Sequence, residues 1–215
     1  MACDLWLVPL VDVLCQRPDN PFSEELACYD QALAEAGLPP VPVTSYVPGT
    51  SGRVAPVAGF NYADLHLLRR AYLLHLSGLP VTPAERLDGD YQQLLEMFEA
   101  AAQQAHLVWH FDHAGAYVPV DFPHPVVNDA LMESGGPLGS SHGLLRELQA
   151  VAPVLGIDPR NPPPAPAAPQ RPTRLDEPLA VAGEEGPFMR ERHVWLGLHA
   201  AATRSLAQGA MIVFS

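Results

Sequence analysis

The sequence predicts an α+β fold in which about five helices pack a small mixed or antiparallel sheet. Three observations support this class. Apolar stretches near both ends of the chain indicate buried strands, and residues 106–122 alternate as a β-hairpin does. The segments between them carry apolar residues at helical spacing. Few strands and segregated helices are typical of α+β proteins.

The N-terminal half contains one expected strand and several expected helices. Residues 4–13 predict the strand, which Pro9 shortens or places near an edge. "SEELACYDQALAEAGLPP" predicts a helix capped by Ser23 and ended by Gly37. A long loop follows, and then "NYADLHLLRRAYLLHLSG" predicts a second helix with Asn61 as its cap. "DYQQLLEMFEAAAQQ" continues with helical spacing.

The expected hairpin "HLVWHFDHAGAYVPVDF" places Trp109 at the centre of an apolar face. The opposite face pairs His110 with Tyr117 and His106 with Asp121. Directly opposed side chains have Cβ atoms about 5 Å apart, so each pair can form a hydrogen bond. A carboxylate beside His106 is expected to raise the pKa of that imidazole.

Two histidines on one strand suggest a metal site, but their spacing argues against it. His106 and His110 lie about 13 Å apart along an extended strand, too far to share one ion. A zinc site would need donors from elsewhere, such as His124 or His66. The sequence therefore predicts polar cross-strand pairs and neither a metal nor a cofactor.

The segment "GSSHG" matches the G-x-S-x-G pattern of a hydrolase nucleophile elbow, with Ser141 as the nucleophile. The remaining triad residues would follow in order as Asp158 or Asp176 and then His193 or His199. An elbow needs a strand before its serine, and "ESGGPLG" predicts none. A helix N-terminus capped by Ser140 or Ser141 explains the residues more simply, with an anion site as an intermediate hypothesis.

The C-terminal third predicts a helix at "SSHGLLRELQAV", a proline-rich linker over residues 157–178, and a last helix followed by the strand "AMIVF". One helix and one strand cannot fold alone. Residues 179–215 are therefore expected to pack back onto the body, with the linker looping over a single domain of residues 1–215.

Composition excludes several classes of function. The chain has 12 arginines and no lysine, so it cannot form a lysine Schiff base or a P-loop. Its 24 acidic residues give a net charge of −12, which argues against binding nucleic acid. The acidic residues are spread along the chain, which argues against a DNA mimic. Asp4 precedes the apolar N-terminal stretch, Asp12 interrupts it and no arginine leads it, so we expect no signal peptide and a cytoplasmic location.

These observations favour a bacterial interaction protein, such as an inhibitor or immunity-type partner of a basic protein, over an enzyme. The partner is expected to be a protein, with no nucleic acid and no membrane involved. The alternative is a small hydrolase or metal-dependent enzyme using His106, His110, Asp121 and Ser141. Arg53 is the one charge in the loop 45–61, which is either a binding loop or a plain surface connection. The candidate binding residues are Arg53, His110, His113, Tyr117, Ser140 and Ser141.

Overall fold

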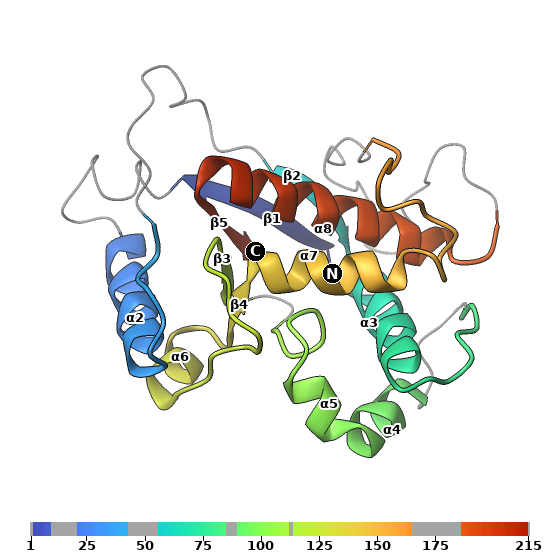
Figure 1. Cartoon of the computed structure of the whole chain (residues 1–215), viewed down its shortest axis with the longest axis horizontal. Helices are drawn as coiled ribbons and strands as arrows, with labels where there is room; N and C mark the ends of the chain where they lie inside the picture. Colours follow the sequence, from blue (N-terminus) through green and yellow to red (C-terminus); the bar gives the residue numbers. More distant parts are fainter. Residues whose placement is uncertain are drawn as a thin grey trace.

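The computed structural model describes residues 2–9, 21–42, 56–84, 90–111, 114–164 and 186–214. It confirms the α+β class, because seven helices in these residues surround one five-stranded mixed sheet (Figure 1). No helix among these residues is long and apolar enough to cross a membrane.

The sheet joins strands from distant parts of the sequence. The strands are β1 (Ala2–Pro9), β2 (Pro56–Asn61), β3 (Ala116–Val118), β4 (Leu138–Ser140) and β5 (Ala210–Phe214). Their order is β2-β1-β5-β3-β4, in which β3 and β4 are parallel and the other neighbours are antiparallel. The last strand of the chain therefore lies at the centre of the sheet.

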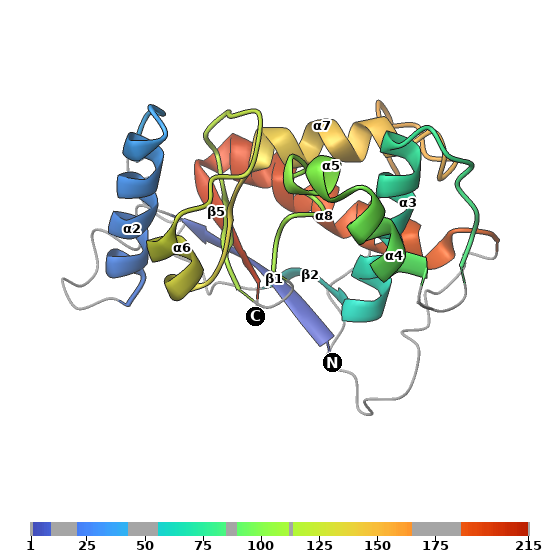
Figure 2. The same ribbon diagram turned by 90° about the horizontal axis from the view of Figure 1, so that it is seen from below.

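The helices form separate groups around this sheet. They are α2 (Pro21–Glu35), α3 (Tyr62–Leu76), α4 (Asp90–Met97), α5 (Glu99–Gln103), α6 (Asp129–Ser134), α7 (Ser141–Val151) and α8 (Met189–Gln208). Helices α3 and α7 pack against α8, whereas α2 packs against α6 at one end of the molecule (Figures 1 and 2). Helices α4 and α5 continue from α3 at a third position.

Each face of the sheet contributes to a different apolar cluster, as the two-residue period of a strand requires. On β5, Ala210, Ile212 and Phe214 belong to the cluster that includes α3, α7 and α8. Met211 and Val213 belong to the cluster that includes α2 and α6. The helix groups on both faces are thus anchored by alternate residues of one central strand.

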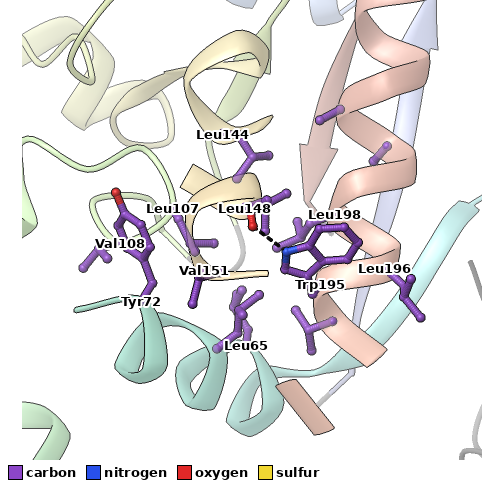
Figure 3. Packing of buried hydrophobic residues seen from close by; sticks show 14 of the residues in the cluster. Leu65, Tyr72, Leu107, Val108, Leu144, Leu148, Val151, Trp195, Leu196 and Leu198 are labelled. Carbon is purple, nitrogen blue, oxygen red and sulfur yellow. Dashed lines mark hydrogen bonds between the residues drawn. The ribbon is translucent and has the colours of Figure 1, made fainter. Parts of the chain in front are cut away.

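Trp195 on α8 lies in the larger cluster, where α3, α7 and α8 meet (Figure 3). Its side chain is fully buried, and its indole N–H donates to the carbonyl oxygen of Leu148 at 2.7 Å. Burying an indole removes a large apolar area from water, and this hydrogen bond satisfies its polar group. Gly209 ends α8 in the left-handed conformation, as expected for a C-terminal glycine.

The predicted hairpin over residues 106–122 does not form. Residues 106–110 make turns, and the amide of Trp109 donates to the carbonyl oxygen of Ala105 at 2.8 Å. Strand β3 pairs instead with β4 and β5. Trp109 is half-buried and is not the centre of an apolar sheet face. The backbone of the turn finds its partners in side chains of α3 and α7, described below, rather than in a neighbouring strand.

The single-domain organisation stays a prediction, because residues 165–185, which include most of the predicted linker 157–178, lie outside the described residues. The described part of the C-terminal segment comprises α8 and β5. Helix α8 contacts α3, α7 and three strands, and β5 pairs with β1 and β3.

Candidate functional site

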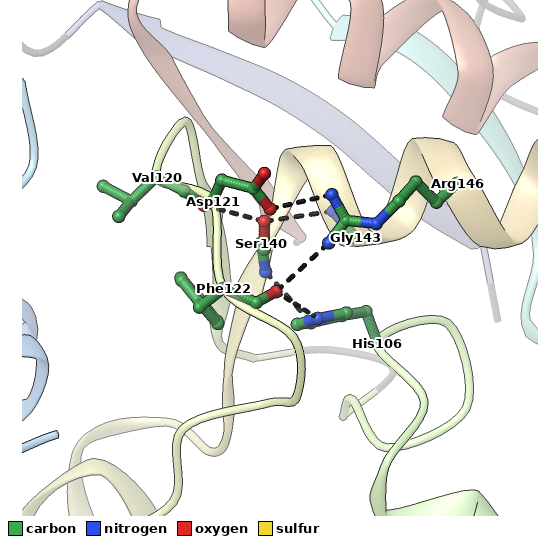
Figure 4. Close-up of polar contacts among 7 residues, drawn as sticks. All are labelled: His106, Val120, Asp121, Phe122, Ser140, Gly143 and Arg146. Atoms are coloured by element: carbon green, nitrogen blue, oxygen red, sulfur yellow. Dashed lines mark hydrogen bonds and ion pairs between the residues drawn. The ribbon is translucent and has the colours of Figure 1, made fainter. Parts of the chain in front are cut away.

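His106 lies in a buried polar junction between the 106–110 turn, the start of α7 and the chain after β3 (Figure 4). The amide of Ser140 donates to Nδ1 at 3.1 Å, and Nε2 lies 3.1 Å from the carbonyl oxygen of Phe122. Because an amide can only donate, Nδ1 must accept, and Nε2 must carry the proton that is donated to Phe122. The junction therefore selects one neutral tautomer of the imidazole.

The environment of His106 shifts its pKa in the direction opposite to the prediction. Burial lowers the pKa of His106 to about 4, and protonating Nδ1 would break the hydrogen bond from Ser140. The predicted pairing with Asp121 is wrong, because Asp121 forms an exposed ion pair with Arg146 at 2.8 Å. With the hairpin absent, no cross-strand register brings the two side chains together.

The two serines of "GSSHG" have structural partners. Ser140 is the N-cap of α7, as predicted: its Oγ accepts from the amide of Gly143 at 3.0 Å and donates to the carbonyl oxygen of Val120 at 2.7 Å. The Oγ of Ser141 lies 2.7 Å from the Oγ of Ser205, and both side chains are fully buried. A nucleophile elbow instead exposes its serine at the top of a sheet.

The two glycines of the motif lie against aromatic rings, which leave no space for a Cβ atom. A Cβ at Gly139 would lie 2.3 Å from Cδ1 of Tyr117, and one at Gly143 would lie 2.1 Å from Cδ2 of His106. The expectation that no strand precedes the motif is wrong, since β4 leads directly into α7. Close packing around Tyr117 and His106 accounts for the two glycines of the pattern.

The predicted contact between His110 and Tyr117 exists, although it does not come from a hairpin. The two rings stack with centroids 4.3 Å apart and an interplanar angle of 8°, and Phe214 of β5 lies against His110. The hydroxyl of Tyr117 donates to the carbonyl oxygen of His106 at 2.8 Å. The two other predicted binding residues, Arg53 and His113, lie outside the described residues.

Two charged side chains hold the 106–110 turn from opposite sides. Glu147 of α7 accepts from the amides of His106 and Leu107 at 2.7 and 2.6 Å. Arg69 of α3 donates to the carbonyl oxygens of Leu107 and His110 at 2.9 and 2.8 Å. Burial raises the pKa of Glu147 to about 7, even though these two amides favour its charged form.

Neither residue was among the site residues predicted from the sequence, although their helical positions give a signal. Glu147 lies three residues after Leu144 and four before Val151, and so lies beside the apolar stripe of α7. Arg69 lies four residues after Leu65 on the apolar side of α3. A charged residue at such a position faces the core and needs a partner there.

Trp109 lies on the turn that these side chains hold, and it lines two adjoining pockets of about 440 and 330 Å³. Both pockets are also lined by Gln92 and Leu95 of α4. We call the pair the Trp109 groove. Its larger half is completed by His66, Arg69, Tyr91, Val108, His110 and Phe111, and its smaller half by Glu96, Glu99 and Ala102.

Most arginines in the described residues form hydrogen bonds or ion pairs with other groups of the chain. Of the seven arginines in the described residues, five donate to carbonyl or carboxylate groups of the protein. These are Arg69, Arg70, Arg146, Arg190 and Arg192. They lie on α3, α7 and α8, and Arg69 and Arg70 are buried. Much of the positive charge is therefore internal or neutralised.

The acidic residues are distributed differently. The described segments 21–42, 90–111 and 114–145 carry four, three and three acidic residues and no arginine or lysine. These segments contain the helix pairs α2–α6 and α4–α5, which stand apart from α7 and α8 in Figure 1. Most acids of these segments therefore lie apart from the bound arginines, with the exposed Asp121–Arg146 ion pair as an exception.

Comparison with known proteins gives one family match. Residues 1–214 match the model of a family described as "Putative DNA-mimic protein". No curated protein and no solved structure matches the chain.

The family match corrects the function predicted from the sequence. That prediction favoured a generic inhibitor or immunity-type partner of a basic protein, and it set a DNA mimic aside because the acids are dispersed. The dispersal argument overlooked that helices distant in sequence can bring their acids together, as α2 and α6 do by packing against each other. The comparisons give no support to the alternative hydrolase or metal-dependent enzyme. Since the matched region spans residues 1–214 of 215, the chain belongs to the family described as "Putative DNA-mimic protein".

Proposed function

We propose that the chain binds a DNA-binding protein on the surface that contacts DNA, and so competes with DNA for that surface. The family match over residues 1–214 carries this proposal. Duplex DNA presents about one negative charge per 1.7 Å of helix axis, and its partners bind it with arginine and lysine. A carboxylate accepts the same charge-assisted hydrogen bonds as a phosphate oxygen. A net charge of −12 supplies such acceptors.

The exposed acids of the α2–α6 pair support this function. Glu35, Asp129 and Glu133 are exposed. The side-chain amide of Asn128 links the two helices by donating to Oε2 of Glu35 at 2.9 Å. Hydrogen bonds from Gln31 and Asn128 lower the pKa of Glu35 below its ordinary value. The carboxylate is thus held in position and ionised, as a substitute for a phosphate must be.

The test has two steps and uses the full chain. The immobilised chain is incubated with a DNA-free extract of the organism that encodes it, and retained proteins are eluted with salt. Each retained protein is then bound to labelled duplex DNA and titrated with the chain in a mobility-shift assay. We expect a retained DNA-binding protein that loses its DNA as the chain is added, with an effect that weakens as salt is raised.

Polyglutamate of the same net charge serves as the control, because it offers carboxylates without the fold. The chain should displace DNA at a lower concentration than polyglutamate does. A complex that contains chain, retained protein and DNA together would contradict the proposal, and so would equal displacement by polyglutamate.

A further inference from the structure

The two halves of the Trp109 groove differ in charge. The larger half is mainly apolar and contains one cation, Arg69, which is buried and bound to two backbone carbonyl oxygens. The smaller half carries Glu96 and Glu99, both exposed, beside the indole of Trp109. A basic side chain entering the groove would be repelled from the first half and attracted to the second.

The carboxylates of Glu96 and Glu99 in the smaller half can each accept further hydrogen bonds. Oε1 of Glu99 accepts from Gln103 at 3.0 Å, and Oε1 of Glu96 accepts from Gln92 at 3.4 Å. Each partner lies four residues away on the same helical segment. A carboxylate has about four acceptor sites on two oxygens, so one hydrogen bond leaves room for a bidentate donor.

Trp109 is held on a firmly positioned turn. Glu147 binds the amides at its start, Arg69 binds carbonyl oxygens in it, and the amide of Trp109 itself bonds to Ala105. A prepositioned aromatic side chain loses little conformational entropy when a partner binds, and tryptophan is enriched among the residues that dominate interface energies.

We propose that the Trp109 groove receives an arginine side chain of the partner, with the guanidinium between the indole and the carboxylates of Glu96 and Glu99. This inference rests on the proposed function, since the partner is taken to be a DNA-binding protein with an arginine-bearing surface. The apolar half then takes a neighbouring apolar side chain of the same segment. Arginine fits better than lysine, because a planar guanidinium stacks on an indole and binds carboxylates in pairs.

The test uses three short peptides that differ only in their central residue. They are acetyl-Leu-Arg-Leu-amide and the same peptide with lysine or citrulline in place of arginine. Each is titrated into the 15N-labelled full chain at low salt, and the backbone amide of Leu95 is followed by NMR. The arginine peptide should bind about fivefold or more tightly than the other two, as expected for a cation–π contact combined with a bidentate ion pair.

Matched variants distinguish binding in the Trp109 groove from a general attraction of the peptide to an acidic protein. Glu96→Gln/Glu99→Gln and Trp109→Leu should each weaken the arginine peptide by about fivefold to tenfold. The control variant Asp129→Asn/Glu133→Gln removes an equal number of negative charges from α6. It should change the affinity for the arginine peptide by less than about twofold.

Equal affinity for the lysine peptide, an equal loss in the α6 variant, or unchanged binding in Trp109→Leu would each overturn the groove assignment. The DNA competition described above measures the proposed function and does not depend on these peptides. Either conclusion can therefore fail without the other.

Discussion

Replacing Glu147 with glutamine should make the stability of the protein strongly dependent on pH between 7 and 5. Burial raises the pKa of Glu147 to about 7 from its ordinary value of 4.5. The folded state therefore binds more protons than the unfolded state in this range, and Glu147 stabilises the fold as the pH falls. Two-state proton linkage with these two pKa values gives a gain of about 2 kcal/mol from pH 7 to pH 5.

His106 acts in the opposite direction over the same range. Burial lowers its pKa to about 4 from an ordinary value of 6.5, so the unfolded state binds more protons and stability is lost as the pH falls. The same linkage gives a loss of about 2 kcal/mol from pH 7 to pH 5. The contributions of Glu147 and His106 therefore nearly cancel in the natural chain.

Urea denaturation at pH 7.0 and pH 5.0 measures the effect directly. Relative to the natural chain, Glu147→Gln should lose about 2 kcal/mol more on acidification, whereas His106→Asn should lose about 2 kcal/mol less. Comparing each protein with itself at two pH values removes the constant cost of each substitution. If both variants follow the natural chain within about 0.5 kcal/mol, the burial and partners assigned to these two groups are wrong.

Three further predictions follow from the packing. Gly143→Ala would normally favour a helix by about 1 kcal/mol, but the clash with His106 should make it destabilising by about 1–3 kcal/mol in chemical denaturation. Trp195→Ala should cost about 3–5 kcal/mol of unfolding free energy, and Trp109→Ala, at a half-buried position, much less. The reverse order would refute the assigned core. Asp121→Asn should cost under about 1 kcal/mol, because its ion pair is exposed, and a larger loss would indicate a buried partner.

Local sequence patterns were sufficient to predict those elements whose formation depends mainly on their own residues. The cap at Ser140, the end of α8 at Gly209 and the strand β5 all appear as predicted. Each combines a local conformational preference with apolar residues at a regular period, and both are visible in a short window of sequence. The shortage of basic residues was equally visible, and it excluded lysine-based chemistry without any knowledge of the fold.

Short strands were harder to predict, because pairing rather than propensity creates them. Strand β4 has three residues, one of them Gly139, and forms because β3 lies beside it in parallel and because Gly139 leaves space for the ring of Tyr117. Strand β2 lies in a segment that we expected to be mainly loop, and it pairs with β1. Neither pairing leaves a periodic signal in three to six residues.

The sequence by itself determined the α+β class, the acidic net charge and the helix that starts at "SSHG". Tertiary structure decided the conformation of residues 106–110, which alternate as a strand does but form turns. Glu147 and Arg69, each about 40 residues away in the sequence, supply the hydrogen-bond partners that a second strand would have supplied. A backbone adopts whichever conformation satisfies its buried polar groups, and these partners come from side chains that only folding brings near.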